Sequence, residues 1–313
     1  MKRHFANMVF ALILIAYTVY AALDTFVIVR VLTPDTLPTA TAEASTAPTE
    51  APTAVPTATE PPAEQTTTAP ISTDTEYHDD QIDIVLTTMR AENTTVYIAD
   101  VQIADIFLLK TALAGNTYAR NLTETTSVQA ANTGAILAIN GDYYGAQERG
   151  YVLRNGVLYR ASAQRGTDAL VIGADGNFRI INEGETSADT LVREGAWQVL
   201  TFGPALIKDG QVTVSSSDEV GRAMTSNPRT AIGQISEGHY LLVVSDGRTK
   251  ESTGLSLRQL AELMQSLGAQ IAYNLDGGGS STMVFQGRVV NNPTTNGRSI
   301  RERSVSDIVY IGY

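Results

Sequence analysis

Cysteine is absent from this chain of 313 residues, and histidine occurs only three times. Without cysteine the chain can form no disulfide scaffold, no thiolate zinc or iron–sulfur site and no cysteine nucleophile. His4 lies at the N-terminus and His78 at the edge of the predicted folded region, so only His239 is well inside it. A metal site built from several histidines is therefore not expected.

Positive charge is also scarce, because 22 basic side chains face 33 acidic ones and the formal net charge is −11. Such a balance disfavours binding to nucleic acid, whose phosphates would be repelled. We therefore expect no nucleic-acid partner. If the protein binds an anion, it must gather its few arginines in one place.

Charged residues are nearly missing from Met8 to Val29, where Asp24 is the only acidic one. This stretch is long enough to cross a bilayer core of about 30 Å as a helix. Its length and the lack of a good small-x-small cleavage site predict that residues 1–32 form a retained signal anchor. A cleaved signal peptide is the alternative. Because Lys2 and Arg3 precede it, the rest of the chain should lie outside the cytoplasm.

Large apolar residues thin out from residue 33 to residue 77. Between Thr33 and Thr75 the sequence holds 14 Thr, 9 Ala and 8 of the chain's 11 Pro residues. A segment of this composition cannot bury enough surface to offset its ordering entropy. The sequence thus predicts a disordered linker, or stalk, over residues 33–77. Together with the lack of cysteine, this linker suggests a bacterial cell-membrane protein whose folded part, residues 78–313, lies on the extracellular side; we call this part the head. If the anchor is cleaved, the protein would be secreted.

Residues 78–313 are predicted to form one α+β domain, with a mixed β-sheet core and a few packed helices. Turn sequences centred on Asn155-Gly156, Asp175-Gly176 and Asp209-Gly210 predict tight hairpins. One helix is predicted after Ser256, with Gln259 completing a capping box and Gly268 ending it. A weaker helix is predicted over Glu124–Asn132. Short β-branched runs predict strands at Ile82–Leu86, Val96–Val101, Ala135–Ile139, Ala169–Ile172, Ala205–Ile207, Tyr240–Ser245, Ile271–Leu275 and Ile308–Ile311.

Two polar turns follow apolar strands and could carry chemistry, because strand ends present side chains on a rigid support. The first, AINGDYY at 138–144, offers Asn140, a carboxylate at Asp142 and two tyrosines that could stack on a sugar. The second, SDGR at 245–248, brings Asp246 and Arg248 to a loop. Each could equally be a purely structural turn.

Arginines next to strands could bind a phosphate. Arg229 and Thr230 open the apolar run PRTAIG at 228–233, and Arg303 precedes the last strand. A guanidinium can hold a phosphate through two hydrogen bonds. A surface salt bridge is the alternative for either arginine taken alone.

The most specific motif is NLDGGGSSTM at 274–283, between two apolar strands. Three consecutive glycines are entropically costly there, but they let a ligand approach the main chain. Their amides, with nearby hydroxyls, could form an anion nest. The motif lacks the Lys of a phosphate-binding Walker loop and the spacing of a serine-hydrolase elbow. The candidate residues of this motif are Asn274, Asp276, Gly277, Gly278, Gly279, Ser280 and Ser281.

Taken in order, these segments resemble the phosphodiester glycosidase family, whose bacterial members are often labelled exopolysaccharide biosynthesis proteins. The stretches that carry the resemblance are AINGDYY, FGPALIKDGQV (202–212), PRTAIG, SDGR, GLSLRQLAELMQSLGA (254–269), NLDGGGSSTM and RSVSDIVYI (303–311). They cover most of the head and none of the anchor or linker. Asp142 departs from the family pattern, where a small or neutral residue is common.

The resemblance implies a hydrolase that cleaves a sugar-1-phosphodiester in an envelope or extracellular glycan and releases sugar and a phosphomonoester. It implies that Asp276 is the leading carboxylate, acting as base or nucleophile, with Asp246 second. Arg229, Arg303, the three glycine amides and the two serines would bind phosphate, and Asn140 and Asn274 would position sugar hydroxyls. No cofactor is implied.

Two other functions stay open. The head could be a non-catalytic module that binds phosphate-containing envelope polysaccharide through the same arginines and glycines. Alternatively, Asp246 and Asp276 could ligate a divalent cation such as calcium, although two carboxylates are few for such a site.

Overall fold

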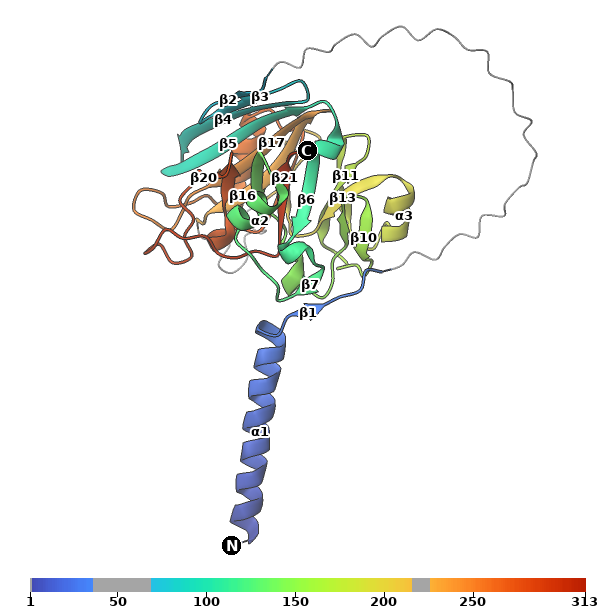
Figure 1. Ribbon diagram of the computed structural model, residues 1–313, viewed down its shortest axis with the longest axis vertical. Helices are drawn as coiled ribbons and strands as arrows, with labels where there is room; N and C mark the ends of the chain where they lie inside the picture. Colours follow the sequence, from blue (N-terminus) through green and yellow to red (C-terminus); the bar gives the residue numbers. More distant parts are fainter. Residues whose placement is uncertain (1, 36–68, 216–225) are drawn as a thin grey trace, which may run out of the picture.

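The computed structural model describes residues 2–35, 69–215 and 226–313, and these ranges contain four α-helices and three extensive β-sheets (Figure 1). The helices are α1 (Lys2–Phe26), α2 (Thr126–Thr133), α3 (Ala188–Arg193) and α4 (Leu257–Ser266). The strands are β1 (Arg30–Val31), β2 (Ile71–Ser72), β3 (Glu76–His78), β4 (Ile82–Ala91), β5 (Thr94–Ile103), β6 (Leu109–Leu113), β7 (Ala119–Arg120), β8 (Leu137–Asn140), β9 (Val152–Arg154), β10 (Val157–Arg160), β11 (Asp168–Gly173), β12 (Phe178–Asn182), β13 (Ala196–Leu200), β14 (Ala205–Lys208), β15 (Gln211–Val212), β16 (Arg229–Ser236), β17 (His239–Ser245), β18 (Ile271–Asn274), β19 (Met283–Phe285), β20 (Arg288–Val289) and β21 (Asp307–Ile311). The predicted α+β fold class is confirmed.

A nine-stranded antiparallel sheet forms the largest layer, in the order β15-β14-β18-β16-β17-β5-β4-β3-β2. A five-stranded sheet in the order β20-β19-β8-β21-β6 packs beside the nine-stranded sheet (Figure 1). A second five-stranded sheet, in the order β10-β9-β13-β11-β12, lies next to both of these sheets. Strands β1 and β7 form a separate two-stranded ribbon.

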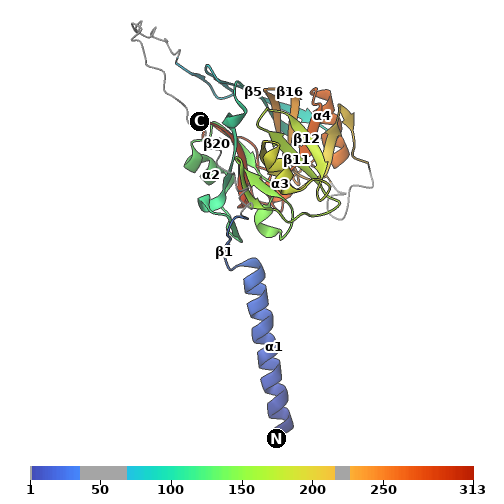
Figure 2. The same ribbon diagram turned by 90° about the vertical axis from the view of Figure 1, so that its right-hand side faces the viewer.

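Both faces of the large sheet are buried at its centre, which explains the continuous apolar run Leu241–Val244. Leu242 and Val244 point into the main core shared with the small sheets. Leu241 and Val243 point the other way, into a second core that α4 covers (Figure 2).

Local sequence signals account for most of the elements. Helix α4 has the predicted capping box, in which Ser256 accepts from the Gln259 amide, and Gly268 follows it with φ +93°. The three predicted hairpins are confirmed as β9–β10, β11–β12 and β14–β15. Helix α3, capped by Ser187, was not predicted, because it is only six residues long.

The N-terminal helix projects away from the head (Figure 2). Its segment Asn7–Thr25 is long and apolar enough to cross a membrane, as predicted for the anchor, although a signal sequence meets the same criterion. Most of the predicted linker, residues 36–68, lies outside the described residues. Strand pairing resumes at Ile71, before the predicted start of the head at residue 78.

A buried arginine ties the two five-stranded sheets together. Arg154, at the end of β9, lies 2.8 Å from the Asp142 carboxylate and 3.0 Å from that of Asp307, which begins β21. Burial, and next the nearby Asp142 charge, raise the pKa of Asp307 to about 7. One guanidinium thus faces two enclosed carboxyl groups, and Asp307 keeps its proton to a higher pH than an exposed aspartate does.

The raised pKa of Asp307 predicts a specific dependence of stability on pH. The Asp307 carboxyl in the unfolded chain ionises near its ordinary value of 3.8, whereas the folded group keeps its proton to about 7. The free energy of unfolding should therefore fall as pH rises between these two values. In Asp307→Asn this contribution should be absent, and urea unfolding at several pH values would show a flatter dependence than in the wild type.

The exposed Asp80→Asn serves as the control, because its curve should run parallel to that of the wild type. If the curve for Asp307→Asn also ran parallel to that of the wild type, the raised pKa of Asp307 would be contradicted.

Candidate active site

The glycine-rich motif lies where the chain crosses from the nine-stranded sheet to a five-stranded one. It leaves β18 after Asn274 and enters β19 at Met283, with a short 3-10 turn at Gly278–Ser280 between them. The start of β16 and the end of β17 lie at the same edge as the end of β18, because these strands are antiparallel neighbours. The fold thereby brings four of the predicted motifs, AINGDYY, PRTAIG, SDGR and NLDGGGSSTM, to one place at the sheet edge, which we call the corner.

Asn140 holds this corner together from the end of β8. Its side-chain amide donates to the main-chain oxygen of Asp276 at 2.6 Å, and its own oxygen accepts from the Thr230 hydroxyl at 2.8 Å. The Thr282 amide also donates to it, at 3.3 Å. Asn140 is fully buried, so its contacts position the turn.

Asp276, Ser280 and Arg303 form the polar centre of the corner. The Ser280 hydroxyl donates to Asp276 Oδ2 at 2.6 Å, and Arg303 Nη2 donates to the same oxygen at 3.0 Å. Arg303 Nε and Nη2 also lie 2.9 and 2.6 Å from Ser280 Oγ. The Asp276 side chain is 12% exposed and that of Arg303 42%, so the pair can be reached from solvent.

Burial raises the pKa of Asp276 above its ordinary value. The Arg303 charge opposes this shift most strongly, and Ser280 and the Gly277 amide also oppose it. The carboxyl thus sits in a poorly solvated site whose ionised form depends on one exposed guanidinium. Such a group is suited to acid–base or nucleophilic work.

The three glycines allow close packing around Asp276. A side chain at Gly277 would approach the main-chain oxygen of Pro228, and one at Gly278 the guanidinium of Arg248. A side chain at Gly279 would overlap the hydroxyl of Thr295. The Gly278 amide donates to Pro228 O at 2.8 Å, so this amide already binds the protein itself.

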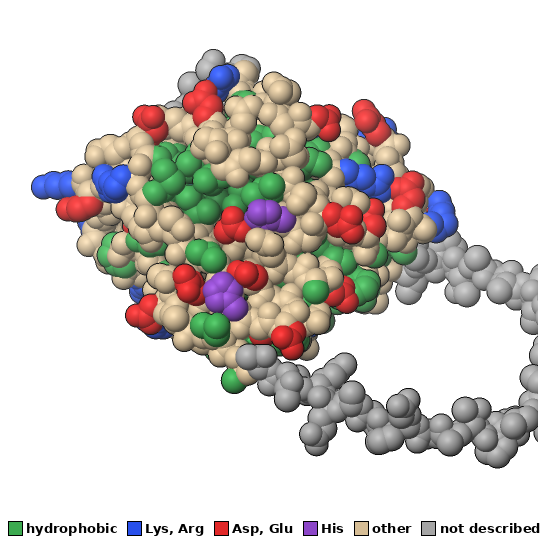
Figure 3. Space-filling model, turned by 90° about the horizontal axis from the view of Figure 1, so that it is seen from above, with side chains coloured by type: hydrophobic (Ala, Val, Ile, Leu, Met, Phe, Trp, Pro, Cys, Tyr) green, Lys and Arg blue, Asp and Glu red, His purple; other side chains and the backbone are tan. Residues whose placement is uncertain are grey.

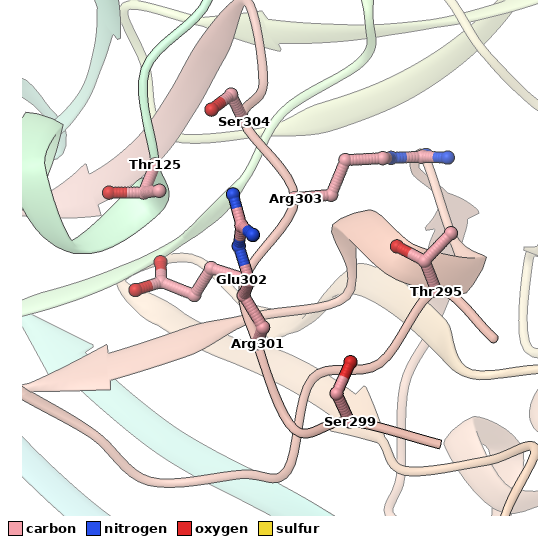
Figure 4. A pocket seen from close by; sticks show the side chains of 7 residues that line it. All are labelled: Thr125, Thr295, Ser299, Arg301, Glu302, Arg303 and Ser304. Atoms are coloured by element: carbon pink, nitrogen blue, oxygen red, sulfur yellow. The ribbon is translucent and has the colours of Figure 1, made fainter. Parts of the chain in front are cut away.

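A cavity of about 470 Å³ opens beside Arg303. Figure 4 shows Arg303 extending over Thr295, while Arg301 reaches toward the middle of the cavity. Thr125, Ser299, Glu302 and Ser304 complete its lining.

The remaining predicted residues divide between this corner and its surroundings. Arg229 is buried beside Gly277, and its Nε donates to Leu255 O at 2.9 Å. Ser281 is buried, and its hydroxyl has no hydrogen-bond partner within the described parts of the chain.

Three predicted residues face other partners. Asp246 accepts from the main-chain and side-chain amides of Asn292, at 2.8 and 2.9 Å. Asn274 donates to Gly203 O at 2.7 Å. Asp142 is enclosed with Arg154, so its contacts favour a structural role.

Sequence reasoning gave no role to Asn227 or Thr295, which hold Arg248 against the glycine turn. Arg248 Nε and Nη2 donate to Asn227 Oδ1 at 3.2 and 3.1 Å, and Nη1 donates to Thr295 O at 2.6 Å. Asn227 directly precedes the PRTAIG motif and Thr295 lies in a loop without a recognisable motif, so their contacts with Arg248 become visible only in the structure.

Within the described parts of the chain, no group of three or more His, Asp or Glu side chains is placed to hold a metal ion. Asp276 is bound instead by an arginine and a serine hydroxyl. This arrangement gives the cation-site alternative no support from the described residues.

The close packing of the glycine turn predicts a steric cost for Gly279→Ala. The added methyl group would overlap Thr295, whose main chain is also near, so the turn must shift. We expect a loss of about 1–3 kcal/mol in the free energy of unfolding, measured by urea denaturation. Gly312→Ala is the matched control, because a methyl group there meets only ordinary contacts. Equal stability of the two variants would show that the turn has room to spare.

Comparison with known proteins gives one family match and several partial relatives. A family model described as "Phosphodiester glycosidase" matches residues 133–312. The SPbeta prophage-derived uncharacterized protein YomE of Bacillus subtilis is 31% identical over 195 residues, which are 61% of this chain and 30% of that protein. The mouse N-acetylglucosamine-1-phosphodiester alpha-N-acetylglucosaminidase is 32% identical over 109 residues, or 31% of this chain and 21% of that protein. The match thus spans less than a third of either relative.

Solved structures share the fold. The zebrafish N-acetylglucosamine-1-phosphodiester alpha-N-acetylglucosaminidase catalytic domain, described as auto-inhibited by its pro-peptide, superposes with a TM-score of 0.59 at 21% identity. The superposition covers 74% of this chain and 83% of that one. A hypothetical protein from Synechocystis gives a TM-score of 0.57 at 15% identity, covering 74% and 62% of the two chains.

Proposed function

Since the chain belongs to the phosphodiester glycosidase family, we propose that it hydrolyses the bond between the anomeric carbon of a sugar and a phosphodiester oxygen. The observation that carries the proposal is the buried but reachable Asp276 carboxyl, held by Arg303 beside an open cavity. The names of the mouse and zebrafish relatives make a sugar such as N-acetylglucosamine the first substrate to test.

The chemistry makes modest demands on the site. A phosphate monoester is a good leaving group, so strong proton donation to the departing oxygen is less necessary than in ordinary glycosidases. The site needs a carboxylate near the anomeric carbon and positive charge near the departing phosphate. Asp276 and Arg303 supply these two groups at neighbouring positions.

Substrate binding would redistribute the contacts of Arg303. In the free protein this guanidinium is bound to Asp276 and Ser280. A substrate phosphate in the cavity would compete for it, and Arg301 lies on the same side to add positive charge. Asp276 then faces the sugar as base or nucleophile, while Asn140 and Thr230 keep its main chain in place.

The wider setting is part of the same proposal. With the apolar N-terminal helix retained as an anchor, the head would act outside the cytoplasm on a glycan of the envelope. The long apolar segment Asn7–Thr25 supports this placement.

Asp276→Asn should abolish most of the activity. The amide can neither accept a proton nor attack carbon, so kcat/KM should fall by about 10²–10⁴-fold. The assay is the release of free sugar and a phosphomonoester from a sugar-1-phosphodiester by the purified full chain. Asp100→Asn, on the surface beside His239, should keep the wild-type rate.

Wild-type turnover in Asp276→Asn would remove the central assignment. Tight binding of the ester by the wild type without any product would favour the alternative of a binding module.

The raised pKa of Asp276 predicts where activity is lost in acid. A base or nucleophile must be ionised, so kcat/KM should decline as pH falls through a value above the ordinary 3.8. Arg303→Gln removes the charge that most favours ionisation and should move this decline to higher pH. The pH profile of kcat/KM measures both.

Arg301→Gln is the matched control, since Arg301 lines the same cavity and Asp276 Oδ2 is bound by Arg303. Arg301→Gln should raise KM without shifting the pH at which kcat/KM declines in acid. If both variants shifted the pH of this decline equally, a direct effect of Arg303 on Asp276 would be contradicted.

A further inference from the structure

Residues 27–35, which we call the strap, fasten the head directly to the end of the apolar helix. Strand β1 pairs with β7, and the Leu32 amide donates to Tyr118 O at 2.9 Å. The Asp35 carboxylate accepts from the Ala161 amide at 2.7 Å. The head is therefore attached from Arg30 to Leu32, before the Thr/Pro-rich segment begins, and Asp35 extends the attachment into the first residues of that segment.

The head also caps the helix. Asn121 has φ +59°, and its side-chain amide donates to the main-chain oxygens of Ile28 and Asp24, at 3.0 and 3.4 Å. The contact with Asp24 satisfies one of the carbonyl groups that a helix C-terminus leaves open, and the contact with Ile28 holds the first residues after the helix. The strap thus joins helix and head through side-chain as well as main-chain contacts.

The strap limits how far the head can lie from a membrane. Thr25 ends the apolar span and Arg30 is the first paired residue. The five intervening steps reach at most about 18 Å when fully extended. A head attached in this way stays at the membrane surface.

A second cavity, of about 340 Å³, lies at the helix end and includes Thr25 in its wall. Tyr143 lines it with φ +67°, a costly conformation for an aromatic residue, and is 41% exposed. Arg120 lines it too; its Nη1 pairs with the Glu148 carboxylate at 2.7 Å, and its buried Nε has no hydrogen-bond partner among the described residues. An aromatic ring and a guanidinium suit the interface between lipid and water.

The two cavities are neighbours along one antiparallel pair of segments. Glu124 pairs with Val305, so Thr125 lies opposite Ser304 and Thr123 opposite Ser306. The first pair lines the cavity beside Arg303, and the second lines the cavity at the helix end. Residues two apart in extended chain point to the same side, about 7 Å apart. The cavities therefore follow each other on one side of this pair.

We propose that the substrate is a sugar phosphodiester whose other ester partner is a lipid of the same membrane. This rests on the proposed function and on retention of the helix. The sugar lies at Asp276, its phosphate at Arg303, and the lipid that stays esterified to this phosphate extends past Tyr143 toward the helix end. Water replaces the phosphate oxygen at the anomeric carbon, the carbon–oxygen bond breaks, and the lipid phosphomonoester remains in the membrane.

The opposite face of the head suits this orientation. Seen from above in Figure 3, it carries several acidic groups and two histidines next to acids. His78 pairs with Asp83 at 3.0 Å and His239 with Asp100 at 2.7 Å. Such a face is poorly matched to an anionic lipid surface and points away from the helix.

The test compares two esters of N-acetylglucosamine-1-phosphate with the full chain in lipid vesicles. One ester carries hexadecanol and resides in the vesicles, and the other carries ethanol and is soluble. In the first variant, residues 30–35 become Gly and Ser at equal length. In the second, 12 Gly and Ser residues are inserted between Phe26 and Val27, which leaves the strap on the head but lengthens the tether by about 20 Å. The control replaces residues 50–55 in the same way as the first variant.

We expect both variants to lose at least ten-fold in kcat/KM on the vesicle-borne ester and to stay within two-fold of the wild type on the soluble one. The control should match the wild type on both. Wild-type rates of the insertion variant on the vesicle-borne ester would overturn the proposal, even if the replacement variant fails to fold. Absence of hydrolysis of either ester by the wild type would instead overturn the proposed function.

Discussion

The hydrogen bond from the buried Asn140 amide to the main-chain oxygen of Asp276 joins two sheets at the point where the chain passes between them. Asp276 belongs to the turn that leaves β18, whereas Asn140 ends β8 in the neighbouring sheet. Thr230, from β16, binds the other end of the same amide. Three strands far apart in the sequence thus fix one carboxylate, and the positions of Arg303 and the cavity follow from that arrangement.

The acidic balance of the chain makes the placement of its arginines informative. Arg154 is fully enclosed by two carboxyl groups and stabilises the packing of two sheets. Arg303 is also bound to a carboxylate, but it is exposed and borders a cavity. The same type of ion pair, arginine with aspartate, therefore serves two purposes in this protein. The enclosed guanidinium of Arg154 cannot exchange partners, whereas the exposed guanidinium of Arg303 can.

Much of the fold could be predicted from the sequence, because the signals are local. The capping box at Ser256 and the Asn-Gly and Asp-Gly turns act within a few residues. The sequence motifs also identified Asp276 and Arg303, which the structure places in contact. The roles of Asn140 and Asp142 could not be read in this way. Both are polar residues at a strand end, and only tertiary packing buries them against partners more than ten residues away.

The N-terminal region shows the same limit of local reasoning. Composition alone suggests that the Thr/Pro-rich segment separates the helix from the head. The contacts of Asn121 and Leu32 instead attach the helix end to the head before that segment begins, and Ile71 attaches the chain again after it. The segment therefore connects two fixed points on one body, so its length does not set the distance between helix and head. What sets that distance is the pairing of β1 with β7, two residues against two, which no composition reveals.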